Sequence, residues 1–164
     1  YKVGVYTGLL KVAENQSQLA AVVGHELAHV IARHGNERVS TQLATSQALA
    51  LGYQLSGEES PEKIVIFQAL GIGAQIGIIL PFSRSHESEA DLLGLEYMAK
   101  AGFDPRESVQ LWRNMSEGGN SKTPELLSTH PSHSTRIEDL QSNMQPNFAV
   151  YTALVAKNKQ SQCY

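Results

Sequence analysis

Cysteine is nearly absent from this chain. Its only one, Cys163, lies one residue from the C-terminus, so the chain cannot form an internal disulfide or build a metal site from thiolates. Positive charge is also sparse, because the net charge is -3 and no cluster of Lys or Arg stands out. Proteins that bind nucleic acid usually carry such a cluster. We therefore expect no nucleic-acid partner.

Internal repeats, low-complexity segments and signs of a second domain are absent too. With 41% hydrophobic and 18% charged residues, the composition is that of an ordinary globular protein that can bury a core. We predict a single domain over residues 1–164. No signal peptide precedes Tyr1, where the chain opens directly in strand-like sequence, and we expect that any targeting or anchoring segment has been removed or was never part of this chain.

The most informative motif is H-E-x-x-H at residues 25–29. Cap-type residues before it and a glycine after it predict a helix over about 17–34. Positions four apart on a helix differ by about 40° in direction and about 6 Å in rise, so His25 and His29 can bind one ion from one face. Imidazole nitrogens suit zinc, and Glu26 beside them is placed to accept a proton from a zinc-bound water.

Around this helix the sequence predicts a mainly α fold with a small β-sheet, an α+β class. Residues 2–7 alternate and are rich in β-branched and aromatic side chains. This pattern predicts an edge strand within residues 1–10, which could pair with an extended peptide. A second helix is expected from residue 36 to 55, and a surface loop at 56–61.

The longest apolar run covers residues 64–82 and contains two glutamines and three glycines. Its length approaches the ~20 residues that span a bilayer, but these polar and small residues make it a weak span. We expect a helix that packs in the core over the motif helix. A flap near the cleft and a contact with a membrane surface are the functional alternatives.

Two histidines leave a catalytic zinc one protein ligand short, and the helix predicted over 87–100 offers candidates. Glu87 and Asp91 share a face at i, i+4 spacing, so Glu87 could bind the ion while Asp91 accepts the ring N–H of a ligand histidine. Glu89 points roughly 160° away from Asp91. We therefore prefer Glu87, with His86 and Glu89 as alternatives if the helix starts later.

Two further helices are predicted near the C-terminus, over 105–116 and 132–144. Pro131 holds His130 extended at the entry of the second one. His130 and Arg136 could reach a cleft and stabilise the oxyanion that forms when water attacks a carbonyl. His130 could also rest on the zinc. Alternatively His130 and His133 are surface turn residues, and Arg136 pairs with a helix carboxylate such as Asp139 or Glu138.

Together these motifs resemble peptidase family M48, in particular its bacterial soluble-domain and Oma1-like branch. The resemblance covers most of residues 3–140, with H-E-x-x-H and E-x-x-x-D in the family's order and spacing. The matching stretches are 5–10, 24–29, 83–91, 101–105 and 128–133. The resemblance implies a zincin-like catalytic domain of the gluzincin type, with the metal glutamate at Glu87. It also implies substrate or intermediate binding by His130 and Arg136.

The resemblance further implies an N-terminally truncated domain, since family members usually carry an additional strand segment before the point where this chain starts. Bacterial relatives of this size are typically periplasmic and often membrane-associated, and they act in quality control of envelope proteins. We expect the same localisation here by analogy. A missing N-terminal anchor or the 64–82 segment would supply the membrane contact.

The expected function is that of a zinc metalloendopeptidase, with one zinc per chain, that hydrolyses peptide bonds of misfolded, membrane or envelope proteins. The ligands would be His25, His29 and Glu87. Glu26 would be the general base. The alternative is a non-catalytic, zinc-containing chaperone-like or protein-binding module that exposes the 64–82 segment to unfolded clients. A metal-free helical interaction domain is disfavoured because it leaves the ligand spacings unexplained.

Overall fold

The computed structural model describes Val5 and residues 7–117 and 135–157, apart from the side chain of residue 82. Every regular element among them is helical, with a 3₁₀ turn (η1) and a π-helical turn (η2) beside the α-helices. The elements are η1 (Leu9–Lys11), α1 (Gln16–Ile31), α2 (His34–Leu55), α3 (Pro61–Ala74), η2 (Gln75–Ile79), α4 (Leu80–Lys100), α5 (Arg106–Glu117), α7 (Arg136–Ser142) and α8 (Met144–Val155). The chain divides into two compact units, unit 1 (Tyr1–Ile31 and Glu87–Tyr164) and unit 2 (Ala32–His86).

The small β-sheet expected from the sequence is wrong, because no residue that the structure describes lies in a strand. Part of the expected edge strand lies outside the described residues. The described part turns into η1, whose Leu9 is buried in the core of unit 1. A strand is stable only when its backbone groups pair with a second strand. No other described residue forms a strand, so a strand at residues 2–7 would have no second strand among the described residues to pair with.

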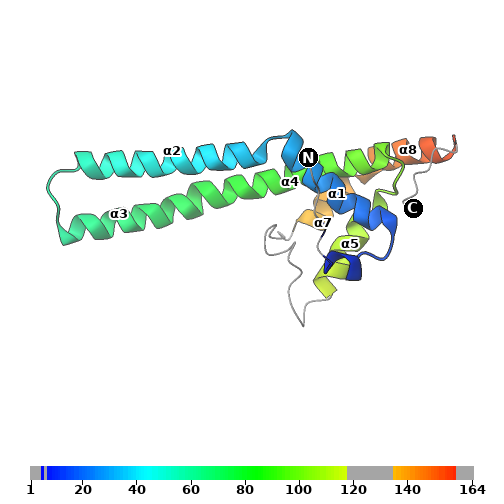
Figure 1. Cartoon of the computed structure of the whole chain (residues 1–164), viewed down its shortest axis with the longest axis horizontal. Coiled ribbons are helices and arrows are strands. Elements are labelled where there is room, and N and C mark those ends of the chain that lie inside the picture. Colours follow the sequence, from blue (N-terminus) through cyan, green and yellow to red (C-terminus); the bar gives the residue numbers. More distant parts are fainter. Residues whose placement is uncertain (1–4, 6, 118–134, 158–164) are drawn as a thin grey trace. The chain divides into compact units, whose positions relative to one another are not determined.

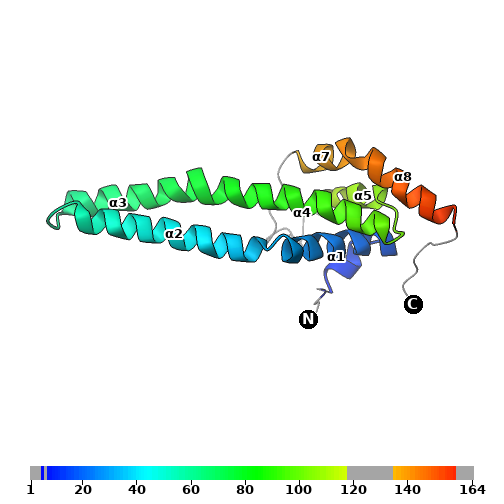
Figure 2. The same ribbon diagram turned by 90° about the horizontal axis from the view of Figure 1, so that it is seen from above.

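Unit 1 is built from η1, α1, α5, α7, α8 and the part of α4 that begins at Glu87. α1 packs against α5, α5 against α7, and α7 against α8. Figures 1 and 2 show α1, α4 and α5 alongside one another. Together with η1 and α7, these helices enclose one apolar core. Its buried members are Leu9, Val22, Leu95, Met98, Val109, Leu111, Trp112, Met115 and Leu140.

Hydrogen bonds connect the N-termini of α1 and α5, and they hold α1, the helix that carries the H-E-x-x-H motif, in position against α5. Asn15 caps α1, where its Oδ1 accepts a hydrogen bond from the backbone N–H of Gln18 at 3.0 Å. The carboxylate of Glu107, in the first turn of α5, accepts from Asn15 Nδ2 at 2.7 Å and from the buried Gln18 Nε2 at 2.8 Å. α1 therefore meets α5 in one defined register.

Unit 2 contains a helical hairpin of α2 and α3, in which the two helices run antiparallel side by side (Figure 1). The predicted second helix is confirmed, and it begins at His34. The break from α1 lies at Arg33, which has a left-handed φ of 60°, and Gly35 is already inside α2. Ser60 caps α3, where its side chain accepts from the backbone N–H of Lys63 at 3.1 Å.

α3, η2 and α4 follow one another without a break from Pro61 to Lys100. The helix expected to start at residue 87 therefore begins earlier, at Leu80. Pro81 lies inside it, although a proline lacks the N–H of a helical residue and crowds the carbonyl four residues before it. That carbonyl belongs to Gly77, which lies in η2. A π-turn widens the backbone locally, so it accommodates the proline without ending the helix.

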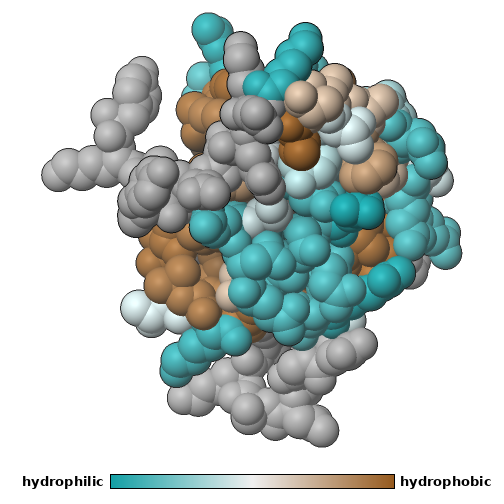
Figure 3. Space-filling view, turned by 90° about the vertical axis from the view of Figure 1, so that its right-hand side faces the viewer, coloured by the Kyte–Doolittle hydropathy of each residue, from teal (hydrophilic) through white to brown (hydrophobic). Residues whose placement is uncertain are grey.

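Burial of the 64–82 segment in a core, also expected from the sequence, is wrong. Large apolar side chains are exposed along most of it, among them Ile64, Val65, Ile66, Leu70, Ile72, Ile76, Ile78 and Leu80. By length and composition, the helix from Pro61 to Lys100 could cross a membrane, and only 6% of its most apolar window is buried. By contrast, hydrophilic residues cover much of the face of the molecule drawn in Figure 3, around separate hydrophobic patches.

Candidate metal centre

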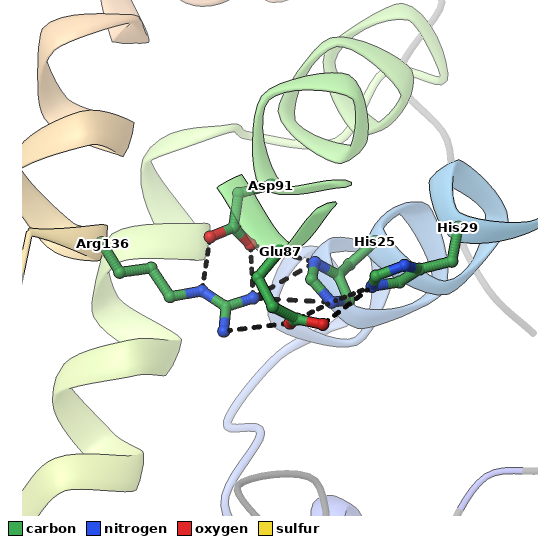
Figure 4. A network of polar contacts seen from close by, with 5 residues as sticks. All are labelled: His25, His29, Glu87, Asp91 and Arg136. Atoms are coloured by element: carbon green, nitrogen blue, oxygen red, sulfur yellow. Dashed lines mark hydrogen bonds and ion pairs between the residues drawn. The ribbon is translucent and has the colours of Figure 1, made fainter. Parts of the chain in front are cut away.

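Three side chains that could bind a metal ion converge in unit 1. His25 and His29 come from α1, and Glu87 comes from α4 (Figure 4). His25 Nε2 lies 3.1 Å from His29 Nε2 and 3.4 Å from Glu87 Oε2. The second carboxylate oxygen, Oε1, lies 3.4 Å from His29 Nε2. All three side chains are buried or nearly so, with exposed fractions of 7%, 17% and 11%.

The geometry and chemistry of these donors fit a zinc ion. Four ligands held tetrahedrally at about 2.0–2.1 Å from zinc lie about 3.3–3.4 Å from one another. The three measured separations, 3.1, 3.4 and 3.4 Å, are close to that spacing. Two imidazoles and one carboxylate are also a donor set that catalytic zinc sites use, with a fourth position left for water or substrate. The structure therefore brings together the three residues that the sequence predicts as ligands.

Asp91 lies one turn after Glu87 on α4 and contacts the other nitrogen of His25. Its Oδ1 is 3.0 Å from His25 Nδ1. A proton on Nδ1 shared with this carboxylate leaves Nε2 directed at His29 and Glu87, as expected of a metal-binding tautomer. This is the geometry predicted from the i, i+4 spacing, although Asp91's role in metal binding itself stays a prediction.

Arg136, from the first turn of α7, is fully buried beside Asp91, with an exposed fraction of 1%. Its guanidinium donates from Nη2 to Asp91 Oδ1 at 2.6 Å, and its Nε pairs with Oδ2. Nη1 lies 3.6 Å from Glu87 Oε2, and the guanidinium carbon lies 3.6 Å from the centre of the Trp112 ring. The alternative of a surface pair with a nearby helix carboxylate is therefore wrong.

The charges of these neighbours act on His25. Burial lowers the pKa of His25, whereas hydrogen bonds with the carboxylates of Asp91 and Glu87 raise it, and the net direction is above the ordinary histidine value. Arg136 opposes the rise by its positive charge. The metal-free cluster thus favours a proton on His25, and an ion that binds there has to displace it.

The other predicted site residues are placed as follows. Glu26 lies on α1 directly after His25 and is half-buried. His86 belongs to unit 2, where its ring stacks on His34 at 4.2 Å and its Nε2 lies 3.0 Å from Glu37. Glu89 is exposed. Of the three candidates on α4, Glu87 is the one that joins the two histidines. His130 lies outside the described residues.

Two contributors to the site were missed at the level of sequence. Trp112 was assigned to the core, but its ring also covers the Arg136 guanidinium. Gly94 was not singled out, although its backbone touches that of His25. A glycine in the interior of a helix costs up to about 1 kcal/mol relative to alanine. Its presence three residues after Asp91 was therefore a usable signal of close packing.

We expect Asp91→Asn to destabilise unit 1 by about 3–5 kcal/mol, because Arg136 would keep its buried charge without the carboxylate that pairs with it. Zinc affinity should fall about 10- to 100-fold through the loss of the His25 contact. Thermal unfolding and zinc titration measure the two effects. The matched control is Glu96→Gln, which breaks an exposed pair with Lys100 on the same helix and should cost no more than about 0.5 kcal/mol. Equal effects of both variants would contradict the assignment.

Comparison with known proteins gives an independent view of the chain. A sequence profile described as Peptidase family M48 matches residues 1–144. The mitochondrial metalloendopeptidase OMA1 of Schizosaccharomyces pombe is 36% identical over 99% of this chain. A putative beta-barrel assembly-enhancing protease of Vibrio cholerae is 38% identical over 84% of the chain, and the beta-barrel assembly-enhancing protease of Escherichia coli is 30% identical over 84%. No solved structure matches.

These relatives are longer proteins. The chain spans 45% of the fission-yeast relative and 29% of each of the two bacterial ones. The match to the family profile nevertheless covers most of the chain and includes both helices that supply the candidate ligands. On this evidence the chain belongs to peptidase family M48.

Proposed function

We propose that this chain is the catalytic part of a zinc metalloendopeptidase. The observation that supports this most strongly is the convergence of His25, His29 and Glu87, whose donor atoms are spaced like the ligands of a tetrahedral zinc site. Membership of a peptidase family, and relatives named metalloendopeptidases, support the same reaction. Protein or peptide substrates follow from that reaction.

In the proposed mechanism, His25, His29 and Glu87 would hold the zinc ion, which would supply Lewis acidity at the scissile carbonyl and lower the pKa of water. Glu26 accepts the proton of the attacking water and later delivers it to the leaving amine. In support, Glu26 belongs to α1, directly after His25 and three residues before His29. Asp91 holds the proton of His25 on Nδ1, so that Nε2 stays available.

Arg136 and His130 are proposed to stabilise the negative charge that develops on the carbonyl oxygen. For Arg136 the supporting geometry is that two of its nitrogens face the ligands, with Nη1 3.6 Å from Glu87 Oε2 and Nη2 3.5 Å from His25 Nε2. Its pairing with Asp91 and its contact with Trp112 hold the guanidinium in one orientation. Such a fixed donor needs little rearrangement as charge develops.

We further propose that the substrates are misfolded, membrane or envelope proteins and that the chain works at a membrane, as in the bacterial periplasm. The exposed apolar side chains of α3 and η2 support membrane contact, because a soluble surface rarely leaves so many together. A non-catalytic, zinc-containing module that holds unfolded clients on the same segment is the second candidate function. The same exposed side chains favour it.

Glu87→Ala should remove the bound metal, whereas Glu89→Ala should keep it. The first change deletes one of three converging donors, and the second alters an exposed residue two positions along the same helix. Metal analysis of the purified proteins should find about one zinc per chain in the wild type and in Glu89→Ala. Zinc retained in Glu87→Ala, or absent from the wild type, would refute this ligand set.

Glu26→Gln should keep zinc but lower the rate of casein cleavage about 10²- to 10⁴-fold, because an amide cannot take the proton of water. Glu14→Gln, the same change at an exposed position, is the control and should cleave casein at the wild-type rate. Cleavage by Glu26→Gln at the wild-type rate would refute the mechanism.

The second candidate function has its own test, the protection of an unfolded client protein from aggregation. It would be established if the chain cleaves nothing and still protects the client after chelation of the metal and in the Glu26→Gln variant.

Ile72→Glu should reduce membrane association about 100-fold, since a charged residue in the hydrocarbon core costs about 2.5–3.5 kcal/mol. The measurement is flotation with phosphatidylethanolamine–phosphatidylglycerol vesicles. Val150→Glu, at an exposed apolar residue of α8, is the control and should float like the wild type. A wild-type chain that stays in the aqueous fraction would contradict membrane contact through this segment.

A further inference from the structure

Gly24 on α1 and Gly94 on α4 bring the backbones of the two helices into direct contact beside His25. A Cβ added to Gly24 would lie 2.8 Å from the carbonyl oxygen of Gly94. A Cβ added to Gly94 would lie 2.8 Å from the backbone nitrogen of His25 and 3.0 Å from its Cα. These neighbours are backbone atoms, which cannot rotate away as a side chain does. The helices can approach this closely only because both positions lack a side chain.

This close approach distinguishes the pair from other helical glycines of the chain. Gly35 in α2 and Gly71 in α3 have no atom within 4 Å of an added Cβ. Glycine is a poor helix former, so a glycine in the middle of a helix calls for a local reason. At Gly24 and Gly94 the reason is the contact between the helices.

The contact lies on the helix faces that carry the candidate ligands. His25 follows Gly24 directly, while Asp91 and Glu87 precede Gly94 by three and seven residues. Spacings of three and seven place Asp91 and Glu87 on the same face of α4 as Gly94, and on α1 Gly24 is the residue next to His25. The glycine pair therefore lies about one turn from the contact between His25 Nδ1 and Asp91 Oδ1, which measures 3.0 Å.

An added methyl group would move the ligands apart. To bring a Cβ from 2.8 Å to the 3.4 Å of ordinary contact, the helices must separate by about 0.6 Å, which exceeds the roughly 0.2 Å that metal–ligand distances tolerate. We propose that Gly24 and Gly94 are positioning residues, whose backbone contact sets the distance between His25 and the carboxylates of α4. The proposal rests on the proposed metal site, but it does not depend on peptidase activity.

The test compares Gly94→Ala and Gly24→Ala with two controls. Gly35→Ala adds the same methyl group to a helix where nothing lies nearby, and Met115→Ala destabilises the core of unit 1 without adding bulk between α1 and α4. Zinc affinity is measured by competition with a chelator, and ligand geometry by the visible absorption of the Co²⁺-substituted proteins. The unfolding temperature of each metal-free variant is recorded alongside, in a stabilising osmolyte to favour the folded state.

We expect zinc affinity to fall about 100-fold in Gly94→Ala and Gly24→Ala, with an altered Co²⁺ spectrum. The zinc affinities of Gly35→Ala and Met115→Ala should stay within about threefold of the wild-type value. This should hold for Met115→Ala even if it lowers the unfolding temperature as much as the glycine variants do. The positioning role would be overturned if the two glycine variants bind zinc with wild-type affinity, or if they lose no more zinc affinity than Met115→Ala does. It would also be overturned if the glycine variants are the only variants that do not fold. Tight zinc binding by a wild-type chain that cleaves nothing would instead count against the proposed function.

Discussion

The buried ion pair between Asp91 and Arg136 is the interaction on which the rest of unit 1 depends. A buried guanidinium without its carboxylate costs several kcal/mol, so α7 and α4 are held together wherever the chain is folded. The same Asp91 carboxylate contacts His25 on α1, and Trp112 on α5 covers the Arg136 guanidinium. One charged contact thus links four helices, and both of its partners contact candidate ligands.

The charge balance around this pair explains why the cluster suits a divalent cation. Two carboxylates, Glu87 and Asp91, face one permanent positive charge on Arg136. Without a metal, a proton on His25 brings the group to neutrality, which agrees with the raised pKa of His25. When a divalent ion replaces that proton, the group carries one net positive charge. Such a site attracts electron-rich oxygen, as a carbonyl or a water molecule offers.

Local spacing allowed the candidate ligands to be predicted, because both pairs, His25 with His29 and Glu87 with Asp91, obey the geometry of a single helix. What joins them could not be predicted in the same way. Arg136 is 45 residues from Asp91 in the chain, and no local pattern in the sequence predicts that the two residues pair. The prediction of an edge strand was wrong for a related reason, since a strand is stable only when it pairs with another strand that can be distant in the sequence. The apolar run from 64 to 82 predicted a helix correctly, but periodicity does not say what covers it.

Covalent geometry connects the proposed metal site with the proposed membrane contact, and this connection holds for any arrangement of the two units. The apolar run has no charged residue from Ile64 to Ser83, and Glu87 follows only four residues later. Four residues reach at most about 14 Å even when fully extended. If the apolar helix lies in a bilayer, the metal cluster must therefore lie near the point where the chain leaves it. Peptide bonds exposed close to a membrane surface would then be within reach of the site, which agrees with the membrane and envelope proteins proposed as substrates.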